Sequence, residues 1–300
     1  MTLDLQKGHV PAKGVLVDLT KCIGCNSCVV ACKMYNDNKW IDDRNPNPAP
    51  TDGQDAKLAD ENWTVVRKCR VSSKDGERIG KDVPIQSNGT EVWRYIKEQC
   101  LHCKDAACVS SCFATAFRTT ELGPVVYYPN LCVGCRYCML ACPFNIPKFE
   151  WDKALPMLTK CTMCSKRVEN GDAPACIVVC PTDVMLYGNY DDVLREAKRR
   201  LADPESKYVQ HIYGEREAGG TYWIYISDKP FETLGFKMNV PMQSIPAYTR
   251  GFTMKSVYVG AIWAGILAFL YFCTGRVAAK KTKNQEQSQQ ENADSAESKE

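Results

Sequence analysis

The hydrophobic residues of this chain fall into many short clusters over its first three quarters and into one long run near the C-terminus. Short stretches rich in β-branched and aromatic residues predict strands. These stretches are 15–18, 63–66 with 69–71, 92–96, 115–120, 125–128, 183–187 and 221–226. Good helix formers from Asp191 to Ala202, followed by Pro204, predict a helix. This mixture of short strands and helices predicts the α+β class.

The long apolar run extends from Ser256 to Gly275 and contains no charged residue. As a helix it is roughly 30 Å long, which is enough to cross a membrane once. A buried core helix is the alternative, but charged residues flank the run. More Lys and Arg follow the run than precede it, which predicts a cytoplasmic C-terminus and a periplasmic globular part at the inner membrane. These residues are Arg250 and Lys255 before it, and Arg276, Lys280, Lys281 and Lys283 after it.

Composition and charge limit the classes of function that this chain can have. The chain has 38 Lys and Arg against 35 Asp and Glu, a net charge of +3, which argues against nucleic-acid binding through a strongly basic surface. The 18 cysteines are far above the usual content and leave disulfides, zinc or iron–sulfur clusters as explanations. No paired catalytic carboxylates, nucleophilic triad or phosphate loop is recognisable, so we expect a chain that is not an enzyme by itself.

Most of the cysteines form four groups of four. The groups are Cys22, Cys25, Cys28 and Cys32; Cys100, Cys103, Cys108 and Cys112; Cys132, Cys135, Cys138 and Cys142; and Cys161, Cys164, Cys176 and Cys180. The first and third groups have the C-x2-C-x2-C-x3-C spacing of bacterial ferredoxins, and the others widen one gap. Zinc and disulfides do not need this spacing. The pattern therefore favours [4Fe–4S] clusters over a zinc-stapled structural membrane protein.

In two-cluster ferredoxins the fourth cysteine of each group binds the other cluster. Groups two and three are adjacent in the chain and can exchange their fourth cysteines, so groups one and four must exchange theirs. The hypothetical ligand sets are Cys22, Cys25, Cys28 with Cys180; Cys161, Cys164, Cys176 with Cys32; Cys100, Cys103, Cys108 with Cys142; and Cys132, Cys135, Cys138 with Cys112.

Repeated strand and helix patterns around the cysteines predict two ferredoxin-like modules that each hold two clusters. The predicted parts are an outer module of 1–32 and 155–190, an inner module of 95–154, an insertion of 33–94, an extension of 191–255, a membrane helix of 256–275 and a disordered tail of 276–300.

Several strings around the cysteines resemble a known family. They are Tyr95-Ile-Lys-Glu-Gln-Cys-Leu-His-Cys, Cys132-Val-Gly-Cys-Arg-Tyr-Cys-Met-Leu-Ala-Cys-Pro-Phe-Asn-Ile-Pro-Lys, Lys160-Cys-Thr-Met-Cys, Pro174-Ala-Cys and Cys180-Pro-Thr. Together with the C-terminal span, they are similar to the four-cluster iron–sulfur subunit of membrane respiratory complexes, as in formate dehydrogenase N and the hydrogenase-2 type. The resemblance covers about residues 12–275.

The resemblance implies an electron-transfer subunit with four [4Fe–4S] clusters. Its partners would be a catalytic subunit, of the molybdopterin or tungstopterin formate dehydrogenase type or the [NiFe] hydrogenase type, and a membrane cytochrome b or other quinone-reactive subunit. No cysteine of the four groups is replaced by Trp or Asp, so no [3Fe–4S] cluster is expected. An iron–sulfur subunit of a multihaem-cytochrome-linked quinone complex is the alternative.

The chain departs from the family pattern at Phe113, which follows group two where the family generally has proline. Its N-terminus carries no twin-arginine leader, unlike the hydrogenase type and like the formate dehydrogenase type. A periplasmic cluster domain would therefore have to cross the membrane folded, carried by a partner. Outside the groups, Cys69 is expected to be a buried strand residue and Cys273 to lie in the span. His102 is assigned either a hydrogen bond to a cluster sulfur or a surface contact. The cations beside ligands, which either tune the clusters or face solvent, are Lys104, Arg118, Arg136 and Lys160.

Overall fold

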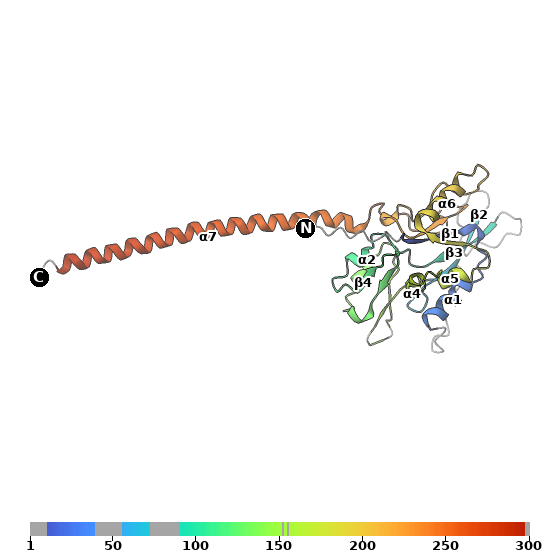
Figure 1. The fold of residues 1–300 in the computed structure, drawn as a ribbon, viewed down its shortest axis with the longest axis horizontal. Coiled ribbons are helices and arrows are strands. Elements are labelled where there is room, and N and C mark those ends of the chain that lie inside the picture. Colours follow the sequence, from blue (N-terminus) through green and yellow to red (C-terminus); the bar gives the residue numbers. More distant parts are fainter. Residues whose placement is uncertain (1–10, 40–55, 73–90, 152, 155, 298–300) are drawn as a thin grey trace. The chain divides into compact units, whose positions relative to one another are not determined.

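The computed structural model of the chain describes residues 11–39, 56–72, 91–151, 153–154 and 156–297. The chain forms two compact units, Met1–Pro246 and Ala247–Glu300. The first unit contains the short strands and helices with all four cysteine groups, and the second is one long helix (Figure 1).

A three-stranded sheet lies at the centre of the first unit. In order across the sheet, the strands are β8 (Met185–Asn189), β1 (Lys13–Asp18) and β9 (Trp223–Ile226). Strand β1 is antiparallel to β8 and parallel to β9. It leads into the first cysteine group, and β8 follows the fourth group. The pairing of Val17 with Met185 therefore holds these two distant groups side by side.

The two faces of this sheet bury different sets of side chains, because successive residues of a strand point to opposite sides. Leu16 and Ile224 pack with helix α6 (Tyr190–Ala202) on one face. Val15 and Trp223 belong to the larger core on the other face, which includes cysteines of the first and fourth groups. Each fully buried aliphatic side chain contributes about 1.5–3 kcal/mol to folding, so the sheet is a stable base for the cysteine loops.

A smaller hairpin connects the second and third cysteine groups. Its strands, β4 (Phe117–Thr119) and β5 (Val125–Tyr127), are antiparallel. The helices that carry cysteines also meet in pairs. Helix α2 (Ala107–Ser110) contacts α3 (Tyr137–Ala141), as α1 (Ser27–Asn36) contacts α5 (Ala175–Val178), and α1 and α5 are neighbours in Figure 1. The cysteine-bearing helices of groups two and three thus meet as those of groups one and four do.

A second hairpin, β2 (Val65–Ser72) and β3 (Glu91–Glu98), packs next to the first cysteine group through the 3-10 turn η1 (Leu19–Lys21). The remaining short elements are η2 (Pro129–Leu131), β6 (Lys148–Phe149), β7 (Leu158–Thr159), α4 (Ser165–Glu169) and η3 (Glu217–Gly219).

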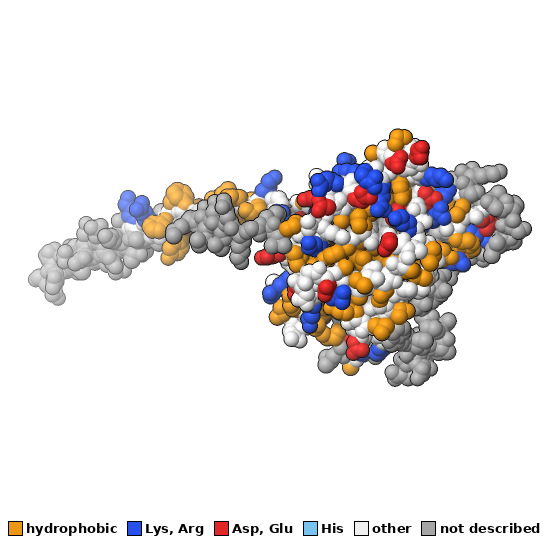
Figure 2. Space-filling view, turned by 45° about the vertical axis from the view of Figure 1, so that its right-hand side comes forward, with side chains coloured by type: hydrophobic (Ala, Val, Ile, Leu, Met, Phe, Trp, Pro, Cys, Tyr) orange, Lys and Arg blue, Asp and Glu red, His pale blue; other side chains and the backbone are white. Residues whose placement is uncertain are grey.

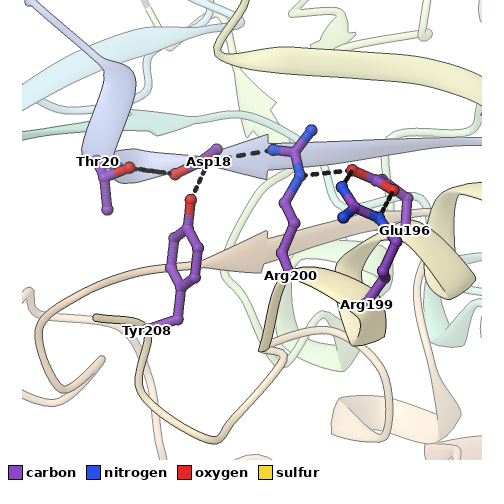
Figure 3. Close-up of polar contacts among 6 residues, drawn as sticks. All are labelled: Asp18, Thr20, Glu196, Arg199, Arg200 and Tyr208. Atoms are coloured by element: carbon purple, nitrogen blue, oxygen red, sulfur yellow. Dashed lines mark hydrogen bonds and ion pairs between the residues drawn. The ribbon is translucent and has the colours of Figure 1, made fainter. Parts of the chain in front are cut away.

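A buried carboxylate at the end of β1 ties the first cysteine loop to helix α6 (Figure 3). Asp18 is fully buried and accepts hydrogen bonds from Thr20 Oγ1 at 2.6 Å and from Tyr208 Oη at 2.6 Å. The Asp18 oxygen that accepts from Tyr208 also pairs with Arg200 Nη1 at 3.1 Å, and Arg200 Nε donates to Glu196 at 2.8 Å. These bonds fix the turn η1, which leads directly into the first cysteine group.

Helix α7 (Ile245–Glu297) makes up the second unit. Its stretch Ile245–Arg276 is long and apolar enough to cross a membrane, with a mean hydropathy of 1.9, and residues 247–276 are exposed. Figure 2 shows hydrophobic side chains along this stretch between lysines and arginines. The predicted span, 256–275, lies inside it. This composition around all faces of the helix is typical of a membrane segment.

The helix continues beyond the predicted span. The tail that the sequence predicts to be disordered is helical in the structure as far as Glu297. The residues after Arg276 include the good helix formers Ala, Lys, Glu and Gln and contain no Gly or Pro that would end the helix.

The predicted strands and the predicted 191–202 helix are present, with ends that shift by a few residues. The strand predicted at 63–71 begins at Val65 and pairs with the strand predicted at 92–96, which begins at Glu91. Residues 40–55 and 73–90 of the predicted insertion lie outside the described residues.

Candidate metal cluster sites

Four cysteines line a cavity beside the first cysteine loop. Cys22, Cys25 and Cys28 come from this loop and the first turn of α1, and Cys180 comes from the residues after α5. The side chain of Lys97, on β3, also lines the cavity. Cys180 reaches the first group because β1 pairs with β8, which lies just beyond Cys180 in the chain.

A second cavity is lined by the other four cysteines of groups one and four. Cys161, Cys164 and Cys176 come from group four, and Cys32 comes from helix α1. The indole of Trp223 closes part of its wall. No cysteine lines both cavities, so the eight side chains separate into two sets of four.

The electrostatic environments of the cysteines in groups two and three indicate that these groups, too, exchange their last cysteines. Burial raises the pKa of the Cys103 thiol well above its ordinary value, and nearby Cys100, Cys142 and Cys108 raise it further. Three of these four residues belong to group two, whereas Cys142 is the last cysteine of group three. The structure therefore brings Cys142 next to group two.

Group three receives the last cysteine of group two in return. Burial raises the pKa of Cys138 to about 12, and Cys112, Cys132 and Cys135 contribute to the same shift. Buried thiols with raised pKa values keep their protons until a metal displaces them, because the thiolate is the form that binds metal. These sites are thus suited to bind metal with release of protons.

The second residue after the first cysteine of each group adopts a left-handed backbone conformation. These residues and their φ angles are Gly24 at 73°, His102 at 50°, Gly134 at 70° and Met163 at 56°. This conformation turns an amide back towards the cysteine. The Gly134 N–H donates to Cys132 Sγ at 3.4 Å, and the Met163 N–H donates to Cys161 Sγ at 3.3 Å. Such N–H donors stabilise thiolate charge and raise the potential of an attached cluster.

The last cysteines of groups two and three receive similar hydrogen bonds. Cys112 Sγ accepts from the Ala116 N–H at 3.3 Å, and Cys142 Sγ accepts from the Ile146 N–H at 3.5 Å. In both cases the acceptor lies four residues before the donor. The two groups therefore present their fourth sulfur to the backbone in the same manner.

The shape and chemistry of these sites fit an iron–sulfur cluster better than a single ion. In the described ranges no group of three His, Cys, Asp or Glu residues is placed to hold one metal ion. A zinc–sulfur bond of about 2.3 Å would draw four sulfurs together around one atom. Trp223 lines the second cavity, and its buried Nε1 has no hydrogen-bond partner in the part of the chain that the structure describes. A sulfide or thiolate of a cluster is the kind of acceptor that this N–H group lacks.

The four cations expected beside ligands have different environments. Lys160 is buried, and its Nζ donates to two backbone carbonyl groups at 2.5 and 2.8 Å. Lys104, Arg118 and Arg136 lie over aromatic rings. Sequence reasoning missed a fifth cation, Lys97, because nothing in a strand sequence shows that its lysine points inwards.

Three other predicted residues are placed as follows. His102 is fully buried, and its Nδ1 accepts from the Val125 N–H at 2.9 Å. Burial and the nearby Lys160 hold its pKa well below the ordinary value, so the ring is neutral. Of the two alternatives for His102, the surface contact is therefore wrong. Cys69 is buried in β2, and Cys273 is exposed on α7, as expected for residues outside the groups.

Comparisons with known proteins agree with this geometry. A family model described as a 4Fe-4S dicluster domain matches residues 91–190. The chain is 34% identical over 247 residues to the hydrogenase-2 operon protein HybA of Escherichia coli O157:H7, covering 74% of this chain and 71% of that protein. It is 33% identical over 221 residues to the iron–sulfur subunit of the nitrate-inducible formate dehydrogenase of Escherichia coli K12, covering 72% and 69%. It is also 38% identical over 270 residues to a protein of Nitratidesulfovibrio vulgaris, covering 90% and 68%.

Proposed function

We propose that this chain, which belongs to the family of iron–sulfur electron-transfer subunits of hydrogenase and formate dehydrogenase complexes, relays electrons through four [4Fe–4S] clusters. Electrons would pass between a catalytic subunit of the formate dehydrogenase or hydrogenase type and a quinone-reactive subunit in the membrane. The chain would bind and position the clusters and would not itself act on the substrate.

The observation that carries this proposal is the exchange of cysteines between groups. Two separate cavities each have four cysteines in their walls, three from one group and one from another. A [4Fe–4S] cluster needs four thiolates, and two-cluster ferredoxins exchange their fourth cysteine in this way. Zinc sites and disulfides need no such exchange.

The proposed ligands divide into two pairs of clusters. The outer pair is held by Cys22, Cys25, Cys28 and Cys180, and by Cys161, Cys164, Cys176 and Cys32. The inner pair is held by Cys100, Cys103, Cys108 and Cys142, and by Cys132, Cys135, Cys138 and Cys112. The pairs would belong to two ferredoxin-like modules, with the outer module made from both ends of the cluster domain.

Each bound cluster supplies one-electron transfer, and the protein supplies ligation, spacing and exclusion of water. Cys25 and Cys135 are exposed, whereas Cys28 and Cys138 are buried. A cluster on either of these groups would therefore have one side near the protein surface, where a partner's redox centre can approach, and one side shielded by the core.

We further propose that α7 anchors the chain in the inner membrane, with the cluster domain on the periplasmic side. Support comes from the exposed apolar run Ser256 to Gly275 within α7 and from the excess of lysine and arginine after this run. The membrane end of the chain would then lie next to the quinone-reactive partner.

The experiment is anaerobic purification of the full chain with its native partners from membranes. We expect a brown complex with roughly 16 irons in this subunit, as four cubanes require. Formate or hydrogen, whichever the partner oxidises, should reduce the clusters, and an added quinone should reoxidise them. A colourless complex that contains zinc, or one whose clusters neither substrate nor quinone affects, would contradict the proposal.

A further inference from the structure

One lysine is buried between the two proposed outer cluster sites. Lys97 lies on β3, and its side chain is 2% exposed. Its Nζ donates hydrogen bonds to Thr64 Oγ1 at 2.9 Å and to Gln99 Oε1 at 2.8 Å, and lies 4.8 Å from the centroid of the Trp223 ring. Gln99 is itself held by a hydrogen bond from its Nε2 to Tyr225 Oη at 2.7 Å. The ammonium group is therefore fixed in one place.

These partners are all neutral. Among the described residues no carboxylate forms an ion pair with Lys97. A buried ammonium group that lacks an opposite charge is costly, because hydrogen bonds to neutral groups replace only part of its hydration. The charge of Lys97 therefore needs a negative partner that is not a side-chain carboxylate.

The two cavities identify that partner. Lys97 lines both of them, the one with Cys22, Cys28 and Cys180 and the one with Cys32 and Cys161. Four thiolates outweigh the positive charge of an iron–sulfide core, so a bound cluster is anionic, and reduction adds one more negative charge. An ammonium group between two such clusters is attracted to both, and more strongly after either is reduced.

We propose that Lys97 is a tuning residue shared by the two outer clusters, whose fixed positive charge raises the reduction potentials of both. This inference rests on the proposed function, since it requires clusters in both cavities. It follows from the low dielectric of the site, where a charge acts more strongly than it does in water.

Electrostatic effects on the cysteines agree with this position. Burial raises the pKa of Cys28 to about 11, and Lys97 acts in the opposite direction. In Cys32, too, Lys97 lowers a pKa that burial and the neighbouring Cys176 raise. The same ammonium group therefore stabilises negative charge on cysteines of both cavities.

The experiment compares variants of the full chain in its native complex by anaerobic redox titration with electron paramagnetic resonance. The outer-cluster signals are first identified as those that Cys25→Ser and Cys164→Ser remove. Lys97→Met then removes the charge, and Lys97→Arg keeps it. Lys21→Met is the matched control, because Lys21 is exposed and lies next to the ligand Cys22, where water screens its charge. Iron is counted in every sample.

In Lys97→Met, we expect both outer clusters to be harder to reduce. At a fixed applied potential, the ratio of reduced to oxidised cluster should fall at least tenfold, which corresponds to 59 mV for a one-electron couple. The inner clusters should shift much less. Lys97→Arg and Lys21→Met should keep outer potentials close to those of the unmodified chain.

Unchanged outer potentials in a fully loaded Lys97→Met complex would overturn the inference and leave the proposed function intact, as would an equal shift in Lys21→Met. If Lys97→Met does not retain its outer clusters, Lys97→Arg decides. If Lys97→Arg retains the outer clusters with their original potentials, the charge of Lys97 has the proposed role. If both variants lose the outer clusters, the role of Lys97 is purely structural and the inference is overturned. Too little iron in the unmodified chain would instead contradict the proposed function.

Discussion

Exchange of the fourth cysteines between groups can be distinguished by mutation from an arrangement in which the four cysteines of each group bind one cluster. In the structure, Cys180 lines the cavity of the first cysteine group, and Cys32 lines the cavity of the fourth. Replacing Cys180 by Ser should therefore affect the cluster that Cys25 holds, although Cys180 lies in the same stretch as the ligands of the other outer cluster. Replacing Cys32 by Ser should affect the cluster that Cys164 holds.

The expected magnitude follows from the separation of the two cavities, which share no cysteine. Each substitution removes one of four thiolates from one site and none from the other. Loss of that cluster would remove roughly a quarter of the iron and sulfide of the chain, and loss of one iron from it would leave a cluster with altered spectra. The β1–β8 pairing, which involves five residues of each strand from Lys13 with Asn189 to Val17 with Met185, should keep the fold in place.

The assay compares difference spectra from electron paramagnetic resonance of four single variants of the reduced full chain. Cys25→Ser and Cys164→Ser mark the two outer clusters, because each of these residues lies in the middle of its own group. We expect the Cys180→Ser difference to match that of Cys25→Ser, and the Cys32→Ser difference to match that of Cys164→Ser. The opposite match, with Cys180→Ser resembling Cys164→Ser, would refute the exchange of ligands.

Three further predictions concern the scaffold. Gly24→Ala should disrupt the first cluster site, because the new Cβ would lie 2.3 Å from the Tyr95 ring. In Gly134→Ala the new Cβ meets no atom within 4 Å, so the change should lower the free energy of unfolding only by the about 1–2 kcal/mol that a left-handed alanine costs. The iron content of both variants tests this, and equal losses of iron would contradict it. Asp18→Asn should lower the free energy of unfolding by about 1.5–3 kcal/mol, because the Asp18 carboxylate accepts hydrogen bonds from the charged Arg200 and from the neutral Thr20 and Tyr208. The temperature at which the visible absorbance of the clusters is lost measures this change in stability. An unchanged temperature would contradict the prediction. Removing iron with a chelator should speed deuterium exchange in β1 and β8 but not in α7, because the clusters would be part of the core that β1 and β8 border. Mass spectrometry of peptides measures the exchange. Equal exchange with and without iron would contradict this role of the clusters.

The cysteine spacing and the strands beside it were predictable because local chemistry determines both. The run from Val15 to Val17 is apolar on both faces and precedes a cysteine loop, and it lies in the central strand of the sheet. Its parallel pairing with β9 was not predictable, because more than 200 residues separate the two strands and no local signal encodes their contact. Tertiary packing decides such pairings.

Within the site, two of the four residues with the left-handed backbone conformation are glycines and two are not. Gly24 and Gly134 indicate a left-handed turn after the first cysteine, since glycine adopts it without cost. His102 and Met163 adopt the same conformation in the other two groups, where the hydrogen bonds of the loop outweigh their intrinsic preference. Lys97 was missed for a related reason. A lysine in a strand normally faces water, and only the assembled core shows that it is buried.

The pairing of β1 with β8 also sets an order of maturation during synthesis. A nascent chain that has just left the ribosome as far as Cys142 already carries every proposed ligand of the inner pair. Neither site of the outer pair has all its ligands until the fourth group has emerged, and β1 has no antiparallel neighbour before β8 is made. We therefore expect iron insertion to proceed from the middle of the domain outwards, with the earliest residues of the chain among the last to settle.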